Sequence, residues 1–336
     1  MAGVRHHTHP RFLLKGFASR VEGAKAFAWV YWRDREPQEW SIRDIAVGKH
    51  FYGREGDVNA DPAITHEEAR FAPLVDDLRR APDGTRIADP MIASLVAHLS
   101  IRTKHLRDSV LESADSLLPH IRLYLSDPRN IEALALAGLT RPDAPWSQNR
   151  RLRRLAVRQA PSFIRQRRMQ LRALAQNALP AVESMLPAAI RSGHIKALAS
   201  TPVPEPRAEH YRSLCWFVCQ SSVPLVIGDV GCLFEVSGPK RYKSLNDKDD
   251  QVQRVSLPLL PDRMLVGTPS PTVPRSDFDA LVEAHARCSR DFFVCSSPSD
   301  RMKALAAKIG DDAALIGKEE MSRLVRALLV EKGMDP

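Results

Sequence analysis

Three histidines within four positions form the densest group of chemically versatile side chains in the sequence. His6, His7 and His9 come just before Pro10, and a short apolar run begins at Phe12. Imidazole is the side chain that titrates nearest neutral pH, and it is the commonest metal ligand in proteins. The group therefore predicts a metal site or a general acid and base. A histidine beside a proline that only orders a turn through a backbone carbonyl has the same pattern.

Carboxylates and arginines elsewhere in the chain supply the partners that such chemistry needs. A carboxylate with a histidine can hold a divalent metal or transfer a proton. An arginine can neutralise a phosphoryl group in a transition state. We expect groups from separated segments to converge on one cleft. The predicted catalytic set is His6, His7, Glu68, Arg102, Arg107 and Asp229.

The same hypothesis includes a divalent metal held by His7, His9 and Asp229. The reaction it predicts is metal-dependent hydrolysis of a phosphodiester, as in a nuclease that acts on nucleic acid. A structural alternative stands beside it, because buried Arg–Asp and Arg–Glu pairs commonly only hold a fold together. The sequence contains no HExxH, GxSxG, Walker or GxGxxG motif that would favour one reading.

A second candidate site is a stretch rich in arginine, which predicts an electrostatic footprint for phosphates. No acidic residue occurs between Asp143 and Glu183, and aromatic residues for base stacking are few there. The alternative function is therefore a non-catalytic nucleic-acid-binding or protein-interaction module. A contact between copies through the long helices would use the same residues. The predicted phosphate-binding residues are Arg150, Arg151, Arg153, Arg154, Arg165, Arg167 and Arg168.

Composition is consistent with a folded protein that has an anionic partner. The chain has 336 residues, of which 44% are hydrophobic, so it can fill a core, and its formal net charge is +9. Five cysteines without a CxxC pair indicate reduced thiols rather than disulfides or a zinc site. The sequence shows no signal-like apolar segment and no apolar run of membrane-span length. We therefore expect a soluble cytoplasmic protein of bacterial type with no membrane partner.

Periodicity predicts elements of both kinds. Residues 26–32 and 39–42 predict a hairpin, Thr65 predicts a helix N-cap, and Asp89 to Leu125 predicts one long helix. Residues 223–229 predict a buried strand whose neighbour is 232–236. The later expectations are strands at 252–259, 264–267 and 292–295, and helices at 277–290, 299–309 and 317–332.

The domain organisation follows from these elements and from one proline-rich stretch. Three prolines in residues 201–206 predict a linker. The predicted parts are a β-rich N-terminal unit (1–62), a mainly helical region (63–200) and a C-terminal α+β part (209–336), whose sheet is mainly antiparallel. The fold class is α+β, and we expect the first and last parts to pack together.

The ordered motifs together resemble a family of bacterial proteins catalogued as domain of unknown function 4238. The resemblance implies an architecture rather than an activity, and it extends over nearly the whole chain. It is carried by His6-His7-x-x-Pro10-x-x-Leu13 with Phe17, Phe51-Tyr52, Glu67/Glu68, Arg102-Thr103 with Arg107, the strand before Asp229, and Leu257-Pro258-Leu259.

Overall fold

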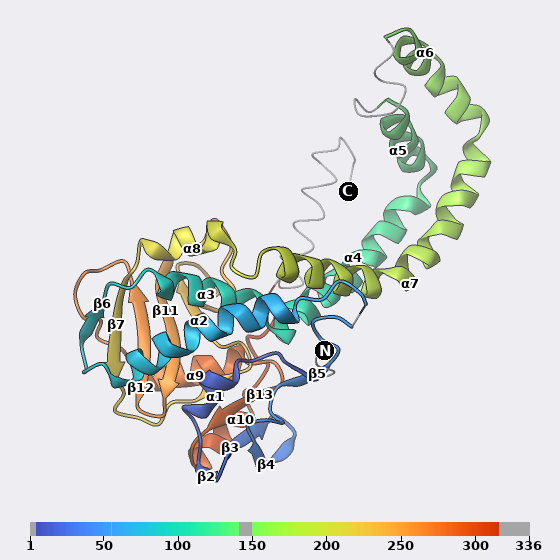
Figure 1. Cartoon of the computed structure of the whole chain (residues 1–336). Coiled ribbons are helices and arrows are strands. Elements are labelled where there is room, and N and C mark those ends of the chain that lie inside the picture. Colours follow the sequence, from blue (N-terminus) through green and yellow to red (C-terminus); the bar gives the residue numbers. More distant parts are fainter. Residues whose placement is uncertain (1–4, 55, 141–149, 316–336) are drawn as a thin grey trace. The chain divides into compact units, whose positions relative to one another are not determined.

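The chain has the α+β fold that the sequence predicts. The computed structural model describes residues 5–54, 56–140 and 150–315. They form two compact units, which Figure 1 shows in the colours of the sequence. We call residues 1–109 with 192–315 the mixed unit, because it contains strands and helices. We call residues 110–191 the helical unit.

These units differ from the three predicted parts (1–62, 63–200 and 209–336). The helices within residues 61–101 belong to the mixed unit, because their apolar faces contribute to its core. The proline-rich stretch 201–206 also lies inside the mixed unit. It leads directly into a short helix that packs against the helix of residues 91–101, so it is no boundary.

Six strands of the described chain form the larger sheet of the mixed unit, and all neighbouring pairs are antiparallel. The third strand, Val252–Leu260, is buried along most of its length, as expected where both faces of a sheet are covered. In spatial order the strands are β10 (Tyr242–Lys243), β9 (Leu233–Val236), β11 (Val252–Leu260), β12 (Arg263–Thr268), β7 (Cys215–Gln220) and β6 (Thr85–Ile87).

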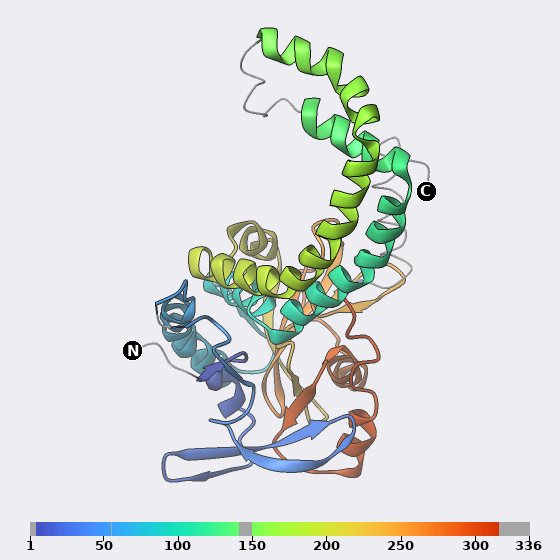
Figure 2. The same ribbon diagram turned by 90° about the vertical axis from the view of Figure 1, so that its right-hand side faces the viewer.

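A second sheet joins residues from the two ends of the chain. Val294 lies opposite Val30, so the C-terminal strand β13 pairs with the N-terminal strand β3 (Figure 2). The predicted hairpin is confirmed as β3 and β4. The five strands described in this sheet are β2 (Arg20–Glu22), β3 (Lys25–Trp32), β4 (Arg35–Ser41), β8 (Ile227–Gly228) and β13 (Phe292–Cys295); separately, β1 (Arg5–His7) pairs with β5 (Val47–Lys49).

Helices pack on the sheets of the mixed unit, and the regular elements described in the helical unit are all helices. Within the described ranges they are α1 (Arg11–Lys15), α2 (Asp61–Arg80), α3 (Met91–Ile101), α4 (Lys104–Ser126), α5 (Pro128–Thr140), α6 (Arg150–Gln166), α7 (Arg168–Ser200), α8 (Glu205–Arg212), α9 (Phe278–Cys288) and α10 (Asp300–Ala306). The boundaries between the two units lie within α4 and α7. In the part of the chain that is described, no helix combines the length and apolar character needed to cross a bilayer.

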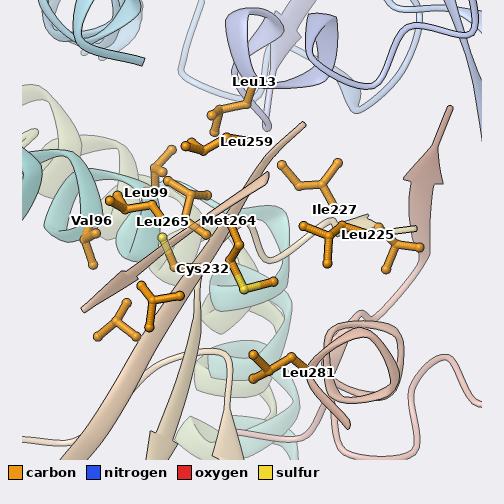
Figure 3. Close-up of a cluster of buried hydrophobic side chains, with 14 of the residues drawn as sticks. Leu13, Val96, Leu99, Leu225, Ile227, Cys232, Leu259, Met264, Leu265 and Leu281 are labelled. Carbon is orange, nitrogen blue, oxygen red and sulfur yellow. The ribbon is translucent and has the colours of Figure 1, made fainter. Parts of the chain in front are cut away.

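The core of the mixed unit lies between strands and helices that are distant in sequence. Figure 3 shows Leu99 of α3 near Leu265 of β12, and Leu281 of α9 across the strands. Successive strand residues point to opposite faces of a sheet, so β12 can contact side chains on both sides of the sheet. All five cysteines are free thiols, and four of them are buried.

Three local predictions need correction. Helix α2 begins at Asp61 rather than after Thr65, so Glu68 is not in its first turn. The predicted helix from Asp89 to Leu125 is two helices, because the hydroxyl of Thr103 accepts the backbone N–H of Leu106 and starts α4 anew. Pro119 is expected to kink or break this helix near its end, but α4 continues through it without a break to Ser126.

The predicted pairing of 223–229 with 232–236 is also wrong. Strand β8 pairs with β13, whereas β9 pairs with β11 in the other sheet. Gly231 lies between them with φ of +73°, a left-handed conformation in which the chain turns away at little steric cost. The predicted helix at 317–332 lies outside the described residues.

Candidate functional site

Arg102 is the centre of a buried polar network in the mixed unit. The residue is 1% exposed. Its Nη2 donates to the carbonyl oxygen of His7 at 2.7 Å, and its Nε donates to the hydroxyl of Tyr52 at 3.1 Å. Its Nη1 donates to Glu68. Burial acts to lower the pKa of Arg102, but Tyr52 and Glu68 outweigh it and raise the pKa. The structure thus brings Arg102 and Glu68 together as an ion pair inside the fold.

The histidine on the other side of Arg102 is neutral. Nδ1 of His98 lies 2.8 Å from the carbonyl oxygen of Pro202, which can only accept, so Nδ1 carries the proton. Nε2 is then free to accept from Nη1 of Arg102, at 3.3 Å. Burial, with the charge of Arg102, lowers the pKa of His98 to about 3. His98 therefore completes the arginine's hydrogen bonds without adding charge.

The first two predicted histidines hold the N-terminal strand to the segment of residues 45–52. Nδ1 of His6 accepts the backbone N–H of Tyr52 at 2.9 Å, and the two rings stack with centroids 5.5 Å apart. Nδ1 of His7 donates to the carbonyl oxygen of Ile45 at 3.2 Å, and burial lowers the pKa of His7. Nε2 of His6 lies 4.0 Å from a carboxylate oxygen of Asp61. These contacts favour the turn-ordering reading of the cluster.

Arg107 is held in a second, neighbouring set of contacts. Its Nε donates to Nδ1 of His194 at 3.0 Å, and its Nη2 donates to the carbonyl oxygen of Phe51 at 2.9 Å. The guanidinium also lies 3.6 Å from the centroid of the Phe51 ring. His194 in turn donates through Nε2 to Ile101, and burial lowers its pKa to about 4. Arg107 therefore ties the 50–52 turn to α7.

Asp229 does not join these networks, although it was predicted to share a cleft with them. It follows β8 and is half-buried. Its Oδ1 accepts the backbone N–H of Arg290 at 3.0 Å, and its Oδ2 accepts that of Asp291 at 2.7 Å. Burial raises the pKa of Asp229 to about 7, against the effect of these hydrogen bonds. The carboxyl group therefore keeps its proton to a higher pH than an exposed aspartate does.

His9 is buried nearby, against Gly231. A Cβ atom at Gly231 would lie 3.3 Å from Cε1 of His9, so the ring occupies the space beside this turn. Burial lowers the pKa of His9 to about 3. Its Nε2 has no hydrogen-bond partner among the described residues.

The predicted metal set is not assembled. No group of three or more histidine, cysteine, aspartate or glutamate side chains in residues 5–54, 56–140 and 150–315 is placed to hold a metal ion. His7 instead contacts Ile45, and both oxygens of Asp229 accept backbone hydrogen bonds. The three predicted ligands therefore have different surroundings and do not form one site.

An open cavity of about 580 Å³ lies between the β3–β4 hairpin and the turn that holds Asp229. This is within the size range of small-molecule sites. One wall carries Trp32 and Trp40, whose rings meet edge to face with centroids 5.1 Å apart. The lining also includes Thr8 and Phe51, which are next to His7 and Tyr52 of the buried network in the sequence. The network therefore holds the backbone beside two residues that line the cavity.

Charged side chains surround this cavity on two sides. Arg33 and Arg35 lie on the hairpin side, and Lys104 and Arg290 lie on the other. Lys104 is occupied by Asp108 at 2.7 Å and by Asp291 at 2.8 Å. Within the described ranges, the side chain of Arg35 is exposed and has no hydrogen bond or ion pair.

The arginine-rich stretch forms exposed helix in the helical unit. Residues 110–191 contain thirteen arginines, no lysine and six acidic residues, so this stretch accounts for +7 of the formal charge of +9. The spacing of the α6 arginines places four of them within a narrow stripe on one face of the helix. These exposed residues are Arg151, Arg154, Arg158 and Arg165.

The opposite face of α6 is the one that packs. Ala160 and Ile164 are each 3% exposed and lie on the side away from the arginine stripe. Arg167 and Arg168 are also exposed, and Arg168 pairs with Glu132 of α5. The side chains of Arg150 and Arg153 lie outside the described part of the chain. The predicted phosphate-binding residues that are described are therefore directed to solvent.

The sequence prediction missed two groups of residues for different reasons. Arg158 stands outside the runs of consecutive arginines on which the prediction was based, although its spacing from Arg151 and Arg154 signals the same helical face. Trp32 and Trp40 were predicted only as strand residues. Their convergence with Asp229 depends on the pairing of β3 with β13, for which a single sequence carries no local signal.

Comparison with protein-family models, with curated proteins and with solved structures gives no match for this chain. The resemblance to the family catalogued as domain of unknown function 4238 therefore stays a prediction. The geometry of the two sites carries the functional argument alone.

Proposed function

We propose that the protein binds nucleic acid, without sequence specificity, through the arginine face of α6. The observation that carries this proposal is the stripe of Arg151, Arg154, Arg158 and Arg165 on the solvent face of a helix whose other face packs. Over these residues a helix rises about 21 Å, so the stripe can follow several phosphates of a backbone.

The exclusive use of arginine supports phosphate as the ligand. A guanidinium presents a planar fork of donors that matches phosphate oxygens, and it remains charged at every physiological pH. Residues 144–182 contain no carboxylate that would compete for these donors within the same stretch. The single described aromatic residue of α6, Phe163, has Arg167 near its ring, so backbone contacts rather than base stacking dominate this interface.

Charge reversal on the stripe tests the proposal. Fluorescence anisotropy with a labelled duplex and a labelled single strand would measure the affinity of the full chain and of the variant Arg154→Glu/Arg165→Glu. The matched control is Lys25→Glu/Arg43→Glu, which makes the same charge change on exposed residues of the mixed unit. We expect the stripe variant to lose affinity by about a hundredfold or more, and the control by much less.

Equal losses in the two variants would contradict the proposal, because net charge alone would then explain binding. Vesicles of anionic lipid serve as a comparison. Binding to vesicles but not to nucleic acid would assign the stripe to a membrane surface instead. Sedimentation velocity on the same samples tests the separate prediction that the long helices associate between copies.

The metal-dependent phosphodiesterase remains a prediction of the sequence. Arg102, Glu68 and Arg107 are committed to contacts inside the mixed unit, which leaves them poorly placed to contact a substrate. Binding rather than cleavage is therefore the function that we propose. Incubation of bound duplex with Mg²⁺, Mn²⁺ or Zn²⁺ tests the difference, and metal-dependent fragments that vanish in Asp229→Asn would restore the hydrolase hypothesis.

A further inference from the structure

The cavity beside the β3–β4 hairpin has features of a ligand site that the arginine stripe does not explain. It belongs entirely to the mixed unit, and its volume of about 580 Å³ can enclose a ligand of nucleotide size. Trp40 is 38% exposed although it covers Ala28, which lies opposite it in the ladder. Together with Trp32 it presents an aromatic surface to the cavity, and such surfaces stack with flat heteroaromatic rings.

One cation of the β3–β4 hairpin, next to this aromatic surface, is available for an anionic group. Arg35 lies opposite Trp32 in the hairpin, and its exposed guanidinium has no partner among the described residues. The other cations that line the cavity already have hydrogen-bond or ion-pair partners. Arg33 donates to the carbonyl oxygen of Ile309 and to Asp311, and Lys104 is shared between two aspartates. Arg35 is therefore the side chain that can pair with an incoming phosphate at least cost.

The carboxyl group of Asp229 offers polar contacts in the same cavity. Its oxygens accept backbone hydrogen bonds from Arg290, Asp291 and Phe292, which leaves acceptor capacity for a further donor. These hydrogen bonds also fix the orientation of the group. Because burial raises the pKa of Asp229 to about 7, the group can donate as well as accept near neutral pH. The edge of a nucleobase presents both kinds of partner.

We propose that this cavity binds a mononucleotide, with its base against Trp32 and Trp40, its phosphate at Arg35 and a polar edge of the base at Asp229. A neutral sugar would leave Arg35 without a counter-charge, and a purely apolar ligand would leave the remaining lone pairs of Asp229 unused. Three other lining carboxylates oppose the phosphate, of which Asp44 is paired with Arg5 and Asp291 with Lys104. Asp34 is exposed beside Arg35 and has no cationic partner in the described ranges.

Calorimetric titration of the full chain separates the parts of this proposal. The probes are the four common nucleoside 5′-monophosphates, adenosine, and inorganic phosphate alone. We expect saturable binding of at least one monophosphate, weaker binding of the nucleoside, and weakest binding of phosphate. Trp40→Ala should weaken binding of both AMP and adenosine by about tenfold, because it removes stacking surface. Arg35→Glu should weaken the binding of AMP by a similar factor and leave the binding of adenosine unchanged.

Two further variants act as controls of opposite kinds. Asp34→Asn should strengthen AMP binding, because it removes a repelling charge. Lys25→Glu lies at the other end of β3 and should leave all affinities unchanged. Both positions are exposed, as are Arg35 and Trp40, so far-ultraviolet circular dichroism should show an intact fold for every variant.

Absence of saturable binding for all four monophosphates would overturn the proposal. So would equal behaviour of Arg35→Glu and Lys25→Glu. Loss of AMP binding in Arg154→Glu/Arg165→Glu, with retention in Arg35→Glu, would transfer the binding to the α6 stripe. Conversely, AMP binding that survives in the stripe variant would support the cavity even if the chain fails to bind nucleic acid.

Discussion

At the scale of single residues, the arginine that the sequence predicts to be catalytic is buried and makes contacts that hold the fold together. Arg102 joins α3 to Glu68 of α2, to Tyr52 and to the backbone of His7. Removing it leaves the Glu68 carboxylate without its cationic partner, and it takes one donor each from the hydroxyl of Tyr52 and the carbonyl of His7. The free energy of unfolding is expected to fall by about 3–5 kcal/mol in Arg102→Ala, because a broken buried ion pair leaves uncompensated polar groups.

The matched control is another arginine–glutamate pair, located on α2. Arg70 donates to Glu67 at 2.9 Å, but its own side chain is 51% exposed. Arg70→Ala should cost about 0–1 kcal/mol. Urea denaturation followed by tryptophan fluorescence measures both variants. A cost for Arg102→Ala no larger than that for Arg70→Ala would contradict the structural role of the network.

At the scale of elements, one glycine shows how closely α1 approaches the large sheet. Gly16 ends α1 with an ordinary φ of −63°, so its backbone conformation does not require glycine. A Cβ there would lie 2.2 Å from the carbonyl oxygen of Leu259 in β11 and 2.5 Å from Nη2 of Arg79. Gly16→Ala should therefore destabilise the mixed unit by about 1–3 kcal/mol.

Gly193 provides the comparison, because it lies inside α7 and a Cβ added there would have no described atom within 4 Å outside its own helix turn. Gly193→Ala should stabilise the protein by about 0.5–1 kcal/mol through helix propensity. Thermal denaturation of the two variants should therefore shift in opposite directions. Destabilisation by both would indicate that α7 is closely covered at this position.

Most elements of the mixed unit could be predicted from the sequence, because their signals are local. The β3–β4 hairpin, the strands β11, β12 and β13 and the helix α9 follow from period and turn residues. The pairings of β8 and β9 could not be predicted, since a short turn at Gly231 sends them to different sheets. An exposed arginine-rich helix could be predicted from the sequence. The cavity could not, because it depends on the long-range pairing of β3 with β13.

At the scale of the whole molecule, buried neutral histidines make stability depend on pH. Burial lowers the pKa of His9, His98 and His285 to about 3, and burial lowers the pKa of His105 and His194 to about 4, from an ordinary value of 6.5. Between pH 6.5 and about 4 the unfolded chain binds protons that the folded chain does not. The free energy of unfolding should therefore fall as the solution is acidified through this window.

Asp229 acts in the opposite direction, because burial raises its pKa to about 7 and the folded state holds the proton more tightly. Asp229→Asn removes this opposing contribution, so its stability should fall more steeply than that of the wild type on acidification from about pH 6.5 to about 4.5. The midpoints of urea denaturation at several pH values measure how steeply the stability of the wild type and of Asp229→Asn depends on pH. A wild-type stability that rises on acidification would show that the histidines are not buried in their neutral form.

The central claim is that α6 contacts the phosphate backbone of a nucleic acid, and the salt dependence of binding tests it most directly. Each lost phosphate contact lowers the magnitude of the slope of log Kd against log salt concentration by about 0.9. For Arg154→Gln/Arg165→Gln we predict a slope shallower than the wild type by about 2 units, with Lys25→Gln/Arg43→Gln unchanged. Parallel slopes for the wild type and the α6 variant would contradict the account.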